Sequence, residues 1–396
     1  MSISSVTVVG GGLAGFTVAR ELRSRGFDGA LRIVDPQGLP YDRPPLSKGY
    51  LAGETEIGDL HLAPPEWYAE NSVDIVEDVA TKVADGSVVL RDGTTLDADA
   101  VVLATGGRAR RLPIPGSDLP GVVALRDRAD ADALREALRP GVRLVIVGAG
   151  LIGAEVASTA TKAGASVVLV DPVPVPLVPA VGAELAEVLH GMHATHGVEV
   201  VEGAPSAVVP DGSALRVELD GRSIPADLVL AAIGLEVDDS LAESVGVEWD
   251  GGTVVDELGR TANPAIRAAG DGIRVRAADG TVQRRSEHWE AAMLSGAAAA
   301  CGLLGEEPPE RPPSWFWSDR YGVHVEAVGS MVAPGSTVLR GETVAFRLSA
   351  TGVLVGCAAI DGGKALRVAR RLIARGVSVS PADLADPTVD LRKAGR

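Results

Sequence analysis

The chain has 396 residues, 46% of them hydrophobic and 23% charged, and its formal net charge is −16. This length exceeds one ordinary core and predicts two or three domains, and the composition excludes a disordered chain. The acidic balance excludes a nucleic-acid binder, which needs clustered Lys and Arg to neutralise phosphates.

The chain opens with Met1–Ser5 and passes straight into the strand-like Val6–Val9. This start has no basic segment ahead of its short apolar run, so we expect no secretory signal. No run approaches the roughly 20 uninterrupted apolar residues that a membrane-spanning helix needs. We therefore expect a cytoplasmic protein with no membrane partner.

A βαβ unit is predicted first, with a strand at Ser5–Gly10, a helix from Leu13 to Arg25 and a strand at Ala30–Asp35. The turn before the helix has GxGxxG spacing, in the order Gly10-Gly11-Gly12-Leu13-Ala14-Gly15. Glycines there allow a tight turn and the close approach of a pyrophosphate, whose charge the helix N-terminus favours. Asp35 follows by about 20 residues, where an acid accepts from a ribose hydroxyl.

A second unit repeats this pattern, with a strand at Val142–Val147, a helix from Leu151 to Lys162 and a strand at Ser166–Asp171. Its turn reads Gly148-Ala149-Gly150-Leu151-Ile152-Gly153. The loop after Asp171 contains no Lys or Arg through Pro179. A 2′-phosphate would need such a cation, and the carboxylate would repel it. This site is therefore predicted to prefer NADH to NADPH.

Shorter strands are predicted around these units, in a hairpin at 87–96 and at Ala100–Ala104, Leu215–Leu219 and Asp227–Ile233. Cys301 and Cys357 are the two cysteines and form no CxxC motif, so no disulfide framework or redox dithiol is predicted and both are expected to be buried. After a Pro-rich linker, three strands and a helix are predicted at Val323–Val328, Thr343–Leu348, Val353–Ile360 and Lys364–Arg375.

This order predicts an α/β fold with two Rossmann-like nucleotide-binding domains and a C-terminal α+β domain. Two dinucleotide sites in one chain indicate a bound flavin and a nicotinamide that visits it. We expect an FAD-binding domain at residues 1–112 and 235–314 and an NAD-binding domain at 113–234. The C-terminal domain, with the dimer or partner interface, is expected at 315–396.

Further motifs occur in order along nearly the whole chain. They are Tyr41-Asp42-Arg43-Pro44-Pro45-Leu46-Ser47-Lys48, Ala104-Thr105-Gly106, Leu125-Arg126, Ala268-Ala269-Gly270-Asp271, Glu287-His288-Trp289 and Trp315-Phe316-Trp317-Ser318-Asp319. Together they resemble the bacterial FAD-dependent ferredoxin reductases, which serve aromatic-ring dioxygenases and class I cytochrome P450 systems and share the glutathione-reductase-like fold. The resemblance implies an NADH:ferredoxin oxidoreductase with FAD and NADH as cofactors. It also implies an acidic [2Fe-2S] ferredoxin as partner, and a monomer or homodimer.

By this resemblance, Lys48 and Glu155 form a catalytic pair near the nicotinamide, with Lys48 at the flavin N5 edge, where a cation stabilises reduced flavin. The residues expected to bind FAD are Gly10, Gly12, Leu13, Ala14, Gly15, Asp35, Arg43, Lys48, Thr105, Gly106, Arg110, Arg126, Asp271, Trp289 and Trp317. Those expected at the nicotinamide site are Gly148, Gly150, Leu151, Ile152, Gly153, Glu155, Asp171 and Gly234. Taken without the family, Lys48 could equally be a solvated cation, Glu155 a helix-dipole carboxylate and the tryptophans a plain core.

Two other groups of residues have alternative interpretations. Three histidines, His190, His193 and His196, cannot all face one ion, because positions i and i+6 of a helix point roughly 240° apart. We expect a solvated helix end there and no metal site. Two arginine clusters are predicted to be either solvated or a docking face for the acidic ferredoxin: Arg108, Arg110 and Arg111, and Arg367, Arg370, Arg371 and Arg375.

The sequence also departs from the family pattern and leaves rival functions open. Arg320 stands where a glutamine is usual, and Ser295 replaces another glutamine. An NADH oxidase or a rubredoxin reductase of the same fold is an alternative, as is a non-enzymatic flavin-binding interaction protein. A thiol–disulfide reductase is disfavoured because it needs a cysteine pair.

Overall fold

The computed structural model describes residues 3–84 and 86–393. The chain forms two compact units: unit 1 comprises Met1–Pro44, Glu56–Arg108 and Leu235–Arg311, and unit 2 comprises Pro45–Thr55, Ala109–Gly234 and Pro312–Arg396. The outer limits of the predicted domains, residues 1 and 396, lie outside the described residues. The three-domain division stays a prediction, because a compact unit can hold more than one domain.

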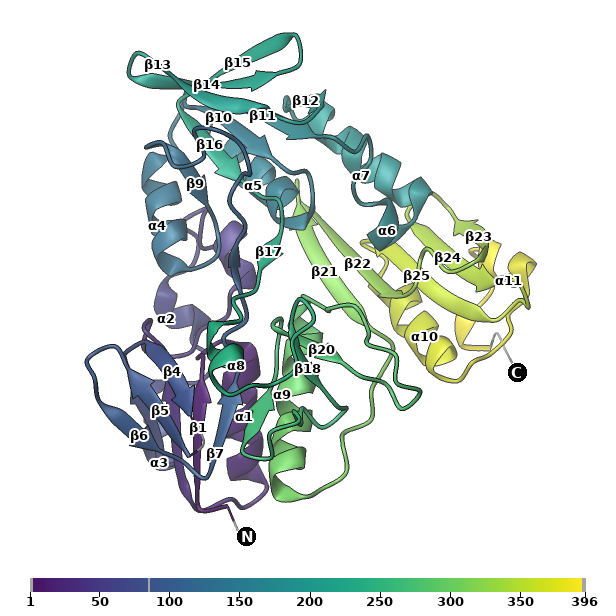
Figure 1. Ribbon diagram of the computed structural model, residues 1–396. Coiled ribbons are helices and arrows are strands. Elements are labelled where there is room, and N and C mark those ends of the chain that lie inside the picture. Colours follow the sequence, from purple (N-terminus) through teal and green to yellow (C-terminus); the bar gives the residue numbers. More distant parts are fainter. Residues whose placement is uncertain (1–2, 85, 394–396) are drawn as a thin grey trace. The chain divides into compact units, whose positions relative to one another are not determined.

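A five-stranded parallel sheet forms the centre of unit 1 (Figure 1). Its strands are, in order, β19 (Ile266–Ala268), β7 (Ala100–Leu103), β1 (Ser5–Val9), β2 (Ala30–Val34) and β3 (Val73–Val76). In register, Val8 lies between Ile33 and Val102. The strands are mostly apolar because both faces of the sheet are covered. The strands predicted at 5–10, 30–35 and 100–104 are confirmed, each ending one residue earlier than predicted.

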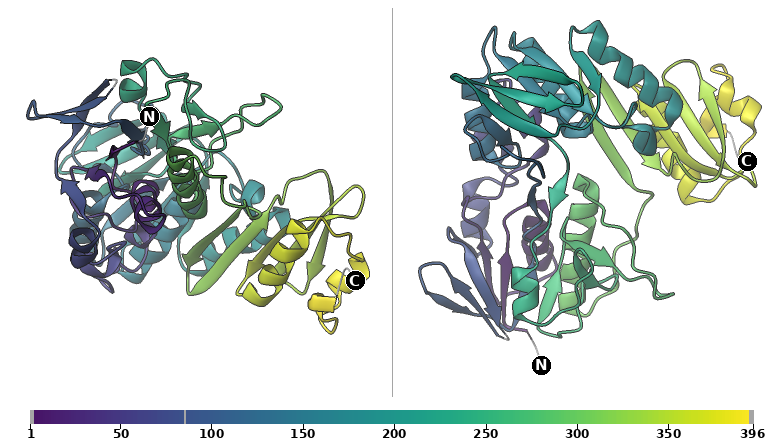
Figure 2. Two further views of the ribbon diagram at one scale, coloured as in Figure 1. Left: turned by 90° about the horizontal axis from the view of Figure 1, so that it is seen from below. Right: turned by 45° about the horizontal axis from the view of Figure 1, so that its top comes forward.

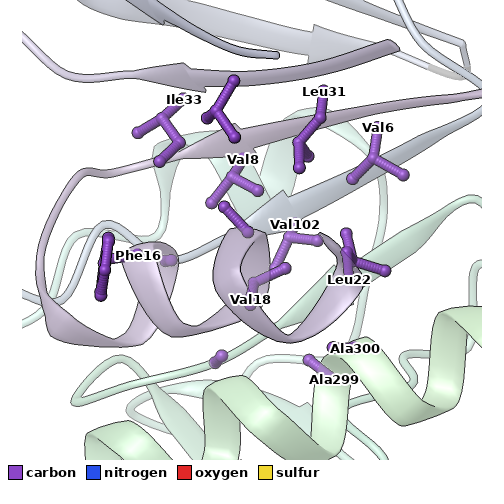
Figure 3. Packing of buried hydrophobic residues seen from close by; sticks show 14 of the residues in the cluster. Val6, Val8, Phe16, Val18, Leu22, Leu31, Ile33, Val102, Ala299 and Ala300 are labelled. Atoms are coloured by element: carbon purple, nitrogen blue, oxygen red, sulfur yellow. The ribbon is translucent and has the colours of Figure 1, made fainter. Parts of the chain in front are cut away.

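Helices α1 (Leu13–Ser24) and α9 (Trp289–Leu304) pack on one face of this sheet. Figure 3 shows Val18 and Leu22 of α1 between the strand side chains and the α9 residues Ala299 and Ala300. The two helices approach closely because Gly296 has no side chain: a Cβ there would lie 2.5 Å from the Ala14 carbonyl oxygen.

The other face of the sheet is covered by a small antiparallel sheet and a short helix, which share a buried cluster with it. These elements are β4 (Ala80–Ala84), β5 (Ser87–Leu90), β6 (Thr95–Asp97) and α8 (Ser240–Ser244). The predicted hairpin at 87–96 is thus confirmed as β5–β6. The remaining elements of unit 1 are α2 (Ile57–Leu60), α3 (Pro65–Glu70), β17 (Leu235–Glu236), β18 (Thr253–Val255) and β20 (Ile273–Val275). Elements η1 (Pro44–Ser47) and β8 (Arg108–Ala109) lie where the chain passes between units.

Unit 2 contains a second parallel sheet of the same type. Its strands are, in order, β12 (Glu199–Glu202), β11 (Ser166–Asp171), β10 (Arg143–Val147), β16 (Leu228–Ala231) and β9 (Val122–Ala124). One face packs against an antiparallel sheet of β13 (Ala207–Asp211), β14 (Ala214–Leu219) and β15 (Arg222–Ala226). The helices of this part are α4 (Arg128–Ala137), α5 (Leu151–Lys162), α6 (Val178–Val181) and α7 (Ala183–Thr195). The predicted second βαβ unit is therefore confirmed.

The C-terminal part of unit 2 is an antiparallel sheet between helices of two origins (Figure 2). Its strands are, in order, β21 (Trp315–Arg320), β22 (Val323–Gly329), β25 (Leu354–Ile360), β24 (Val344–Ser349) and β23 (Gly335–Arg340). On one face lie α10 (Gly363–Ala374), α11 (Pro381–Ala385) and η2 (Leu391–Lys393), and on the other lie α6 and α7. This shared core explains why the C-terminal segment and the second parallel sheet form one compact unit.

The α/β fold class, with its two nucleotide-binding sheets and α+β C-terminal part, is confirmed. The sequence pattern missed β21 and β23, the two edge strands of the C-terminal sheet. Within the described ranges, every helix is too short or too polar to cross a membrane.

Candidate functional site

The first glycine turn, between β1 and α1, has two glycines that are needed for packing and one that leaves space open. A Cβ on Gly10, which has φ 109°, would lie 2.3 Å from the Ala104 carbonyl oxygen, and one on Gly15 would lie 2.0 Å from the Gly10 oxygen. A Cβ on Gly12 would meet nothing within 4 Å. The start of α1 therefore presents open space and backbone N–H groups, which is the cradle that a pyrophosphate requires.

Asp35, directly after β2, closes this cradle. Its carboxylate is buried and accepts the Gly11 N–H at 2.6 Å and the Gln37 N–H at 2.8 Å. The carboxylate is thus fixed beside the turn, where a ribose hydroxyl would reach it. A hollow opens at this position, lined by Gly11, Gly12, Asp35, Gln37, Gly38, Leu39, Tyr41 and Arg43.

Arg43 provides a further test of whether a nucleotide fits. Its Nε is buried and has no hydrogen-bond partner among the described residues. A buried guanidinium N–H without an acceptor is unfavourable unless a ligand supplies one. Because Arg43 lines the same hollow as Gly12, the residues present fit an anionic dinucleotide such as FAD.

The other predicted FAD residues of unit 1 follow the carboxyl ends of the parallel strands. Thr105 and Gly106 come after β7, Asp271 comes after β19, and Leu13 and Ala14 begin α1. Ligands of open α/β sheets bind at this edge. Trp289, the first residue of α9, donates its indole N–H to Asp42 at 2.8 Å. The remaining predicted FAD residues, Lys48, Arg110, Arg126 and Trp317, belong to unit 2.

Ser295 also contributes to this edge, although the sequence marked it only as a departure from the family. Its hydroxyl accepts the Gly270 N–H at 2.9 Å. Gly270 has φ 85°, and a Cβ there would lie 2.9 Å from the Ala14 Cβ. Ser295 therefore supports the backbone directly before Asp271.

The second glycine turn, between β10 and α5, reproduces the first. A Cβ on Gly148 would lie 2.3 Å from the Ala232 oxygen and one on Gly153 would lie 1.9 Å from the Gly148 oxygen, whereas Gly150 has nothing within 4 Å. Asp171 accepts N–H groups from Ala149 at 2.7 Å and Val173 at 2.8 Å.

Residues flanking this second turn complete the predicted nicotinamide site. Leu151 and Ile152 open α5, and Ile152 is exposed. Gly234, with φ 97°, accepts the Arg110 N–H at 2.9 Å. Arg126, which is predicted to bind FAD, precedes α4, and its N–H donates to Asp130 at 2.8 Å.

The predicted Lys48–Glu155 pair is present within unit 2. Lys48 Nζ lies 2.9 Å from Glu155 Oε2, and the Lys48 and Glu155 side chains are 18% and 5% exposed. The hydroxyl of Ser47 donates to the same oxygen at 2.5 Å, and that of Ser318 donates to Oε1 at 2.6 Å. Thr159, one turn further along α5, donates to the Ser47 carbonyl at 2.9 Å and so anchors the Lys48 segment on the helix. The two serines were not predicted.

Strand β21 sends its side chains alternately to its two faces. Ser318 and Arg320 are buried. Trp317, offset by one residue from Ser318, stacks on Trp315 with ring centroids 5.0 Å apart. The stacked pair is held by the Trp315 indole, which donates to Glu326 at 3.0 Å.

The expectation of a solvated helix end at the three histidines is wrong for His193. Its side chain is buried on α7, and its Nδ1 lies 2.7 Å from the Tyr321 hydroxyl. Burial lowers the pKa of His193 to about 3, so the ring is neutral at physiological pH. His196 stacks on the same tyrosine with ring centroids 4.2 Å apart. The error arose because Tyr321 is distant in sequence, and nothing local indicated its contact with α7.

Both cysteines are buried, Cys301 in α9 and Cys357 in β25, and neither forms a disulfide. Burial raises the pKa of both thiols, which keeps them protonated and poorly nucleophilic. The expectation that they are buried is confirmed. Among the described residues, no group of three or more His, Cys, Asp or Glu side chains is arranged to hold a metal ion.

The second arginine cluster lies on α10 and its C-terminal end. Three of its arginines line a hollow together with residues of the preceding linker and of α10: Pro312, Pro313, Arg367, Arg370, Arg371 and Ala374. In the first cluster, Arg108 pairs with Glu236 at 3.4 Å and is largely exposed.

Comparison with known proteins covers nearly the whole chain. Residues 4–296 match the pyridine nucleotide-disulphide oxidoreductase family, and residues 315–395 match the reductase C-terminal family. The chain is 38% identical over 402 residues to the benzene 1,2-dioxygenase system ferredoxin–NAD(+) reductase subunit of Pseudomonas putida. That alignment covers 98% of this chain and 96% of the relative.

Two solved structures share its fold over their full length. A chain of the covalent putidaredoxin reductase–putidaredoxin complex has a TM-score of 0.91 and 31% identity, covering 99% of this chain and 98% of that chain. The ferredoxin reductase for the CYP199A2 system from Rhodopseudomonas palustris has a TM-score of 0.94 and 29% identity, covering 99% and 100%. The resemblance found in the sequence motifs is confirmed. The chain therefore belongs to the pyridine nucleotide-disulphide oxidoreductases and, within them, to the ferredoxin–NAD(+) reductase components of oxygenase systems, which are NADH-dependent flavoproteins.

Proposed function

We propose that this chain oxidises NADH with bound FAD and passes the electrons to a [2Fe-2S] ferredoxin that supplies a dioxygenase or a cytochrome P450. The observation that carries this proposal is the repeated glycine turn, each copy with an open middle glycine and a carboxylate held on the turn. FAD takes two electrons as a hydride and releases them one at a time, which is what a one-electron acceptor requires. The side chains need only bind, orient and balance charge.

In unit 1, the turn at Gly12 and the guanidinium of Arg43 are suited to the pyrophosphate of FAD, and Asp35 to its adenosine ribose. Asp271 and Trp289, at the same edge of the sheet, are assigned to the ribityl chain and the ring system. These two assignments rest on the family resemblance and on their positions after β19 and at the start of α9.

In unit 2, the turn at Gly150 and the carboxylate of Asp171 are assigned to NADH. The preference for NADH over NADPH rests on Asp171 and on the absence of Lys and Arg from residues 172–179. A 2′-phosphate at this position would face a fixed carboxylate and no compensating cation.

The Lys48–Glu155 pair is assigned to hydride transfer. Lys48 supplies a partly buried positive charge, which favours a negatively charged reduced cofactor. Glu155 fixes the direction of the ammonium group, since three donors converge on its two carboxylate oxygens. No nucleophile or general base is needed for this chemistry.

The ferredoxin is proposed to be acidic and to dock on the arginine cluster of α10. Residues 315–396 carry 11 Lys and Arg against 7 Asp and Glu, whereas the whole chain has a net charge of −16. A positive face on a negative protein steers an acidic partner to one region. We further propose that the chain acts in the cytoplasm, where NADH is regenerated, as a monomer or homodimer.

The purified protein tests the proposal directly. We expect flavin absorption, bleaching by NADH, and reduction of cytochrome c that depends on an added [2Fe-2S] ferredoxin. Rapid oxidation of NADH by oxygen alone, without stimulation by ferredoxin, would instead indicate an NADH oxidase. Colourless protein that cannot be reconstituted with FAD would refute the proposal and leave a non-enzymatic role.

A further inference from the structure

Arg320 is a buried cation that the proposed chemistry does not yet use. The residue is 2% exposed, at the end of β21. Its Nη2 donates to the Ser318 hydroxyl at 2.9 Å, but its Nε and Nη1 have no hydrogen-bond partner among the described residues. A buried guanidinium with two unpartnered N–H positions destabilises a fold, and an apolar side chain of similar size is usually tolerated better.

The groups around Arg320 do not explain its burial. Tyr321 is neutral at physiological pH, since burial raises its pKa to about 12, and His193 is neutral as described above. Burial lowers the pKa of Arg320; the charge of Glu155 is the largest opposing influence, and that of Asp319, which pairs with His324, is smaller. Arg320 is thus buried towards the catalytic carboxylate.

The hydrogen-bond directions link Arg320 to that carboxylate. A guanidinium only donates, so the Ser318 oxygen accepts from Arg320 and its single proton points to Glu155 Oε1, 2.6 Å away. A neutral amide at position 320, the usual family residue, can donate or accept and would leave the serine free to turn. Arg320 therefore fixes the donor on Oε1, which leaves Oε2 for Ser47 and Lys48.

We propose that Arg320 is a positioning residue, which acts through Ser318 to hold Glu155 and Lys48 in one geometry. Its buried charge lowers the stability of the fold, and the residue has this positioning role despite that cost. The role of the pair in hydride transfer rests on the proposed function, whereas the positioning and the stability effect do not.

Three variants of the full-length flavoprotein separate the charge from the hydrogen bond: Arg320→Met, Arg320→Gln and Arg320→Lys. We expect Arg320→Met to unfold at the same or a higher urea concentration than the wild type, because an unpartnered buried charge is removed. We also expect its flavin to be reduced by saturating NADH roughly 10-fold more slowly, by analogy with the roughly 10- to 100-fold losses when a residue that orients a metal ligand is removed. The dissociation constant of NADH should not change, since Arg320 is not assigned to NADH.

A matched control is Arg267→Met. Arg267 is also buried and its Nε likewise has no partner among the described residues, but it lies in unit 1 and its Nη1 donates to the carbonyls of Pro264 and Ile266. Because Arg267 has no link to Glu155, its replacement should leave flavin reduction and the labelling of Lys48 unchanged.

Two further measurements distinguish positioning from packing. Ser318→Ala should slow reduction like Arg320→Met, and the double variant should be no slower than either one, because both act on the same bond. Acetic anhydride should label Lys48 several-fold faster in Arg320→Met than in the wild type, with the exposed Lys162 as internal reference. Labelling does not require turnover, so it tests the inference even if NADH fails to reduce the wild-type flavin, a result that would refute only the proposed function.

Arg320 would be assigned to packing if Arg320→Met unfolded earlier than the wild type with unchanged Lys48 labelling. If the losses in the rate of flavin reduction were additive in the variant that combines Arg320→Met and Ser318→Ala, action through Ser318 would likewise be overturned. If Arg320→Met does not fold, the claim that Arg320 destabilises the protein is wrong. The positioning claim would then be tested with Arg320→Gln, and unchanged labelling of Lys48 in that variant would overturn it.

Discussion

Asp171→Asn is the sharpest test of the nucleotide assignment. The carboxylate accepts two backbone N–H groups and is held at the carboxyl end of β11. A 2′-phosphate carries a charge of about −1.5 to −2, and at ~4 Å each pair of unit charges repels by about 1 kcal/mol in water and up to about 4 kcal/mol in a partly buried site. For this part-buried carboxylate we expect roughly 2 kcal/mol, which corresponds to about 30-fold in relative kcat/KM.

The assay is the ratio of kcat/KM for NADH to that for NADPH, measured with ferricyanide so that ferredoxin binding plays no part. Asn retains the size of the side chain but cannot accept both N–H groups, so the absolute rate with NADH should also fall. Glu202→Gln is the matched control, because Glu202 is paired with Asp171 in the β11–β12 register and also carries a carboxylate. A wild type that prefers NADPH, or a ratio that Asp171→Asn leaves unchanged, would refute the reasoning.

Three other changes test separate parts of the molecule. Lys48→Ala should slow flavin reduction by NADH in stopped-flow experiments, because it removes the positive charge that is proposed to favour the reduced flavin. An unchanged rate would assign Lys48 to packing. A triple variant, Arg367→Glu, Arg370→Glu and Arg371→Glu, reverses the charge on α10. It should raise the KM for ferredoxin about 10-fold or more, chiefly because association is slower, and it should leave the reduction of a dye by NADH unchanged. Its effect should shrink as salt is added, and an effect independent of salt would contradict electrostatic docking. Asp227 has its pKa lowered to about 2, chiefly by the hydrogen bond from Arg143. It should therefore add up to about 1 kcal/mol of stability above pH 4 that is lost as the pH falls towards 2, and Asp227→Asn should abolish this part of the acid dependence in urea titrations.

The glycine turns were predictable because their determinants are local. Gly10, Gly12 and Gly15 follow one strand and open one helix, and the same holds for the second turn. The positions of Asp35 and Asp171 also follow from the length of one βα unit. The pairing of Lys48 with Glu155 came from the family resemblance, since no local pattern joins two residues so far apart in the sequence.

The other contacts of the site could not be predicted from the sequence, because they also join residues that lie far apart in the chain. Ser47 and Ser318 reach Glu155 across 108 and 163 positions, and a single serine has no sequence signal of its own. Arg320 was visible in the sequence only as a departure from the family pattern, and the packing of β21 on α5 shows that it is buried. His193 was mistaken for a solvated residue because its partner, Tyr321, lies far away in the sequence, in the turn between β21 and β22.

The C-terminal segment is therefore more than a surface for a partner. The two family matches meet at one carboxylate: residues 4–296 supply Glu155 and Lys48, and residues 315–395 supply Ser318 and Arg320. A chain lacking the second segment would keep both glycine turns, because their contacts lie within 4–296. It would nevertheless lose the donor on Oε1 and expose the face of α7 that packs on the C-terminal sheet. The two glycine turns and the correct placement of the charged pair thus depend on different parts of the sequence. Strand β21 connects the segment that we propose for docking to the proposed site of hydride transfer.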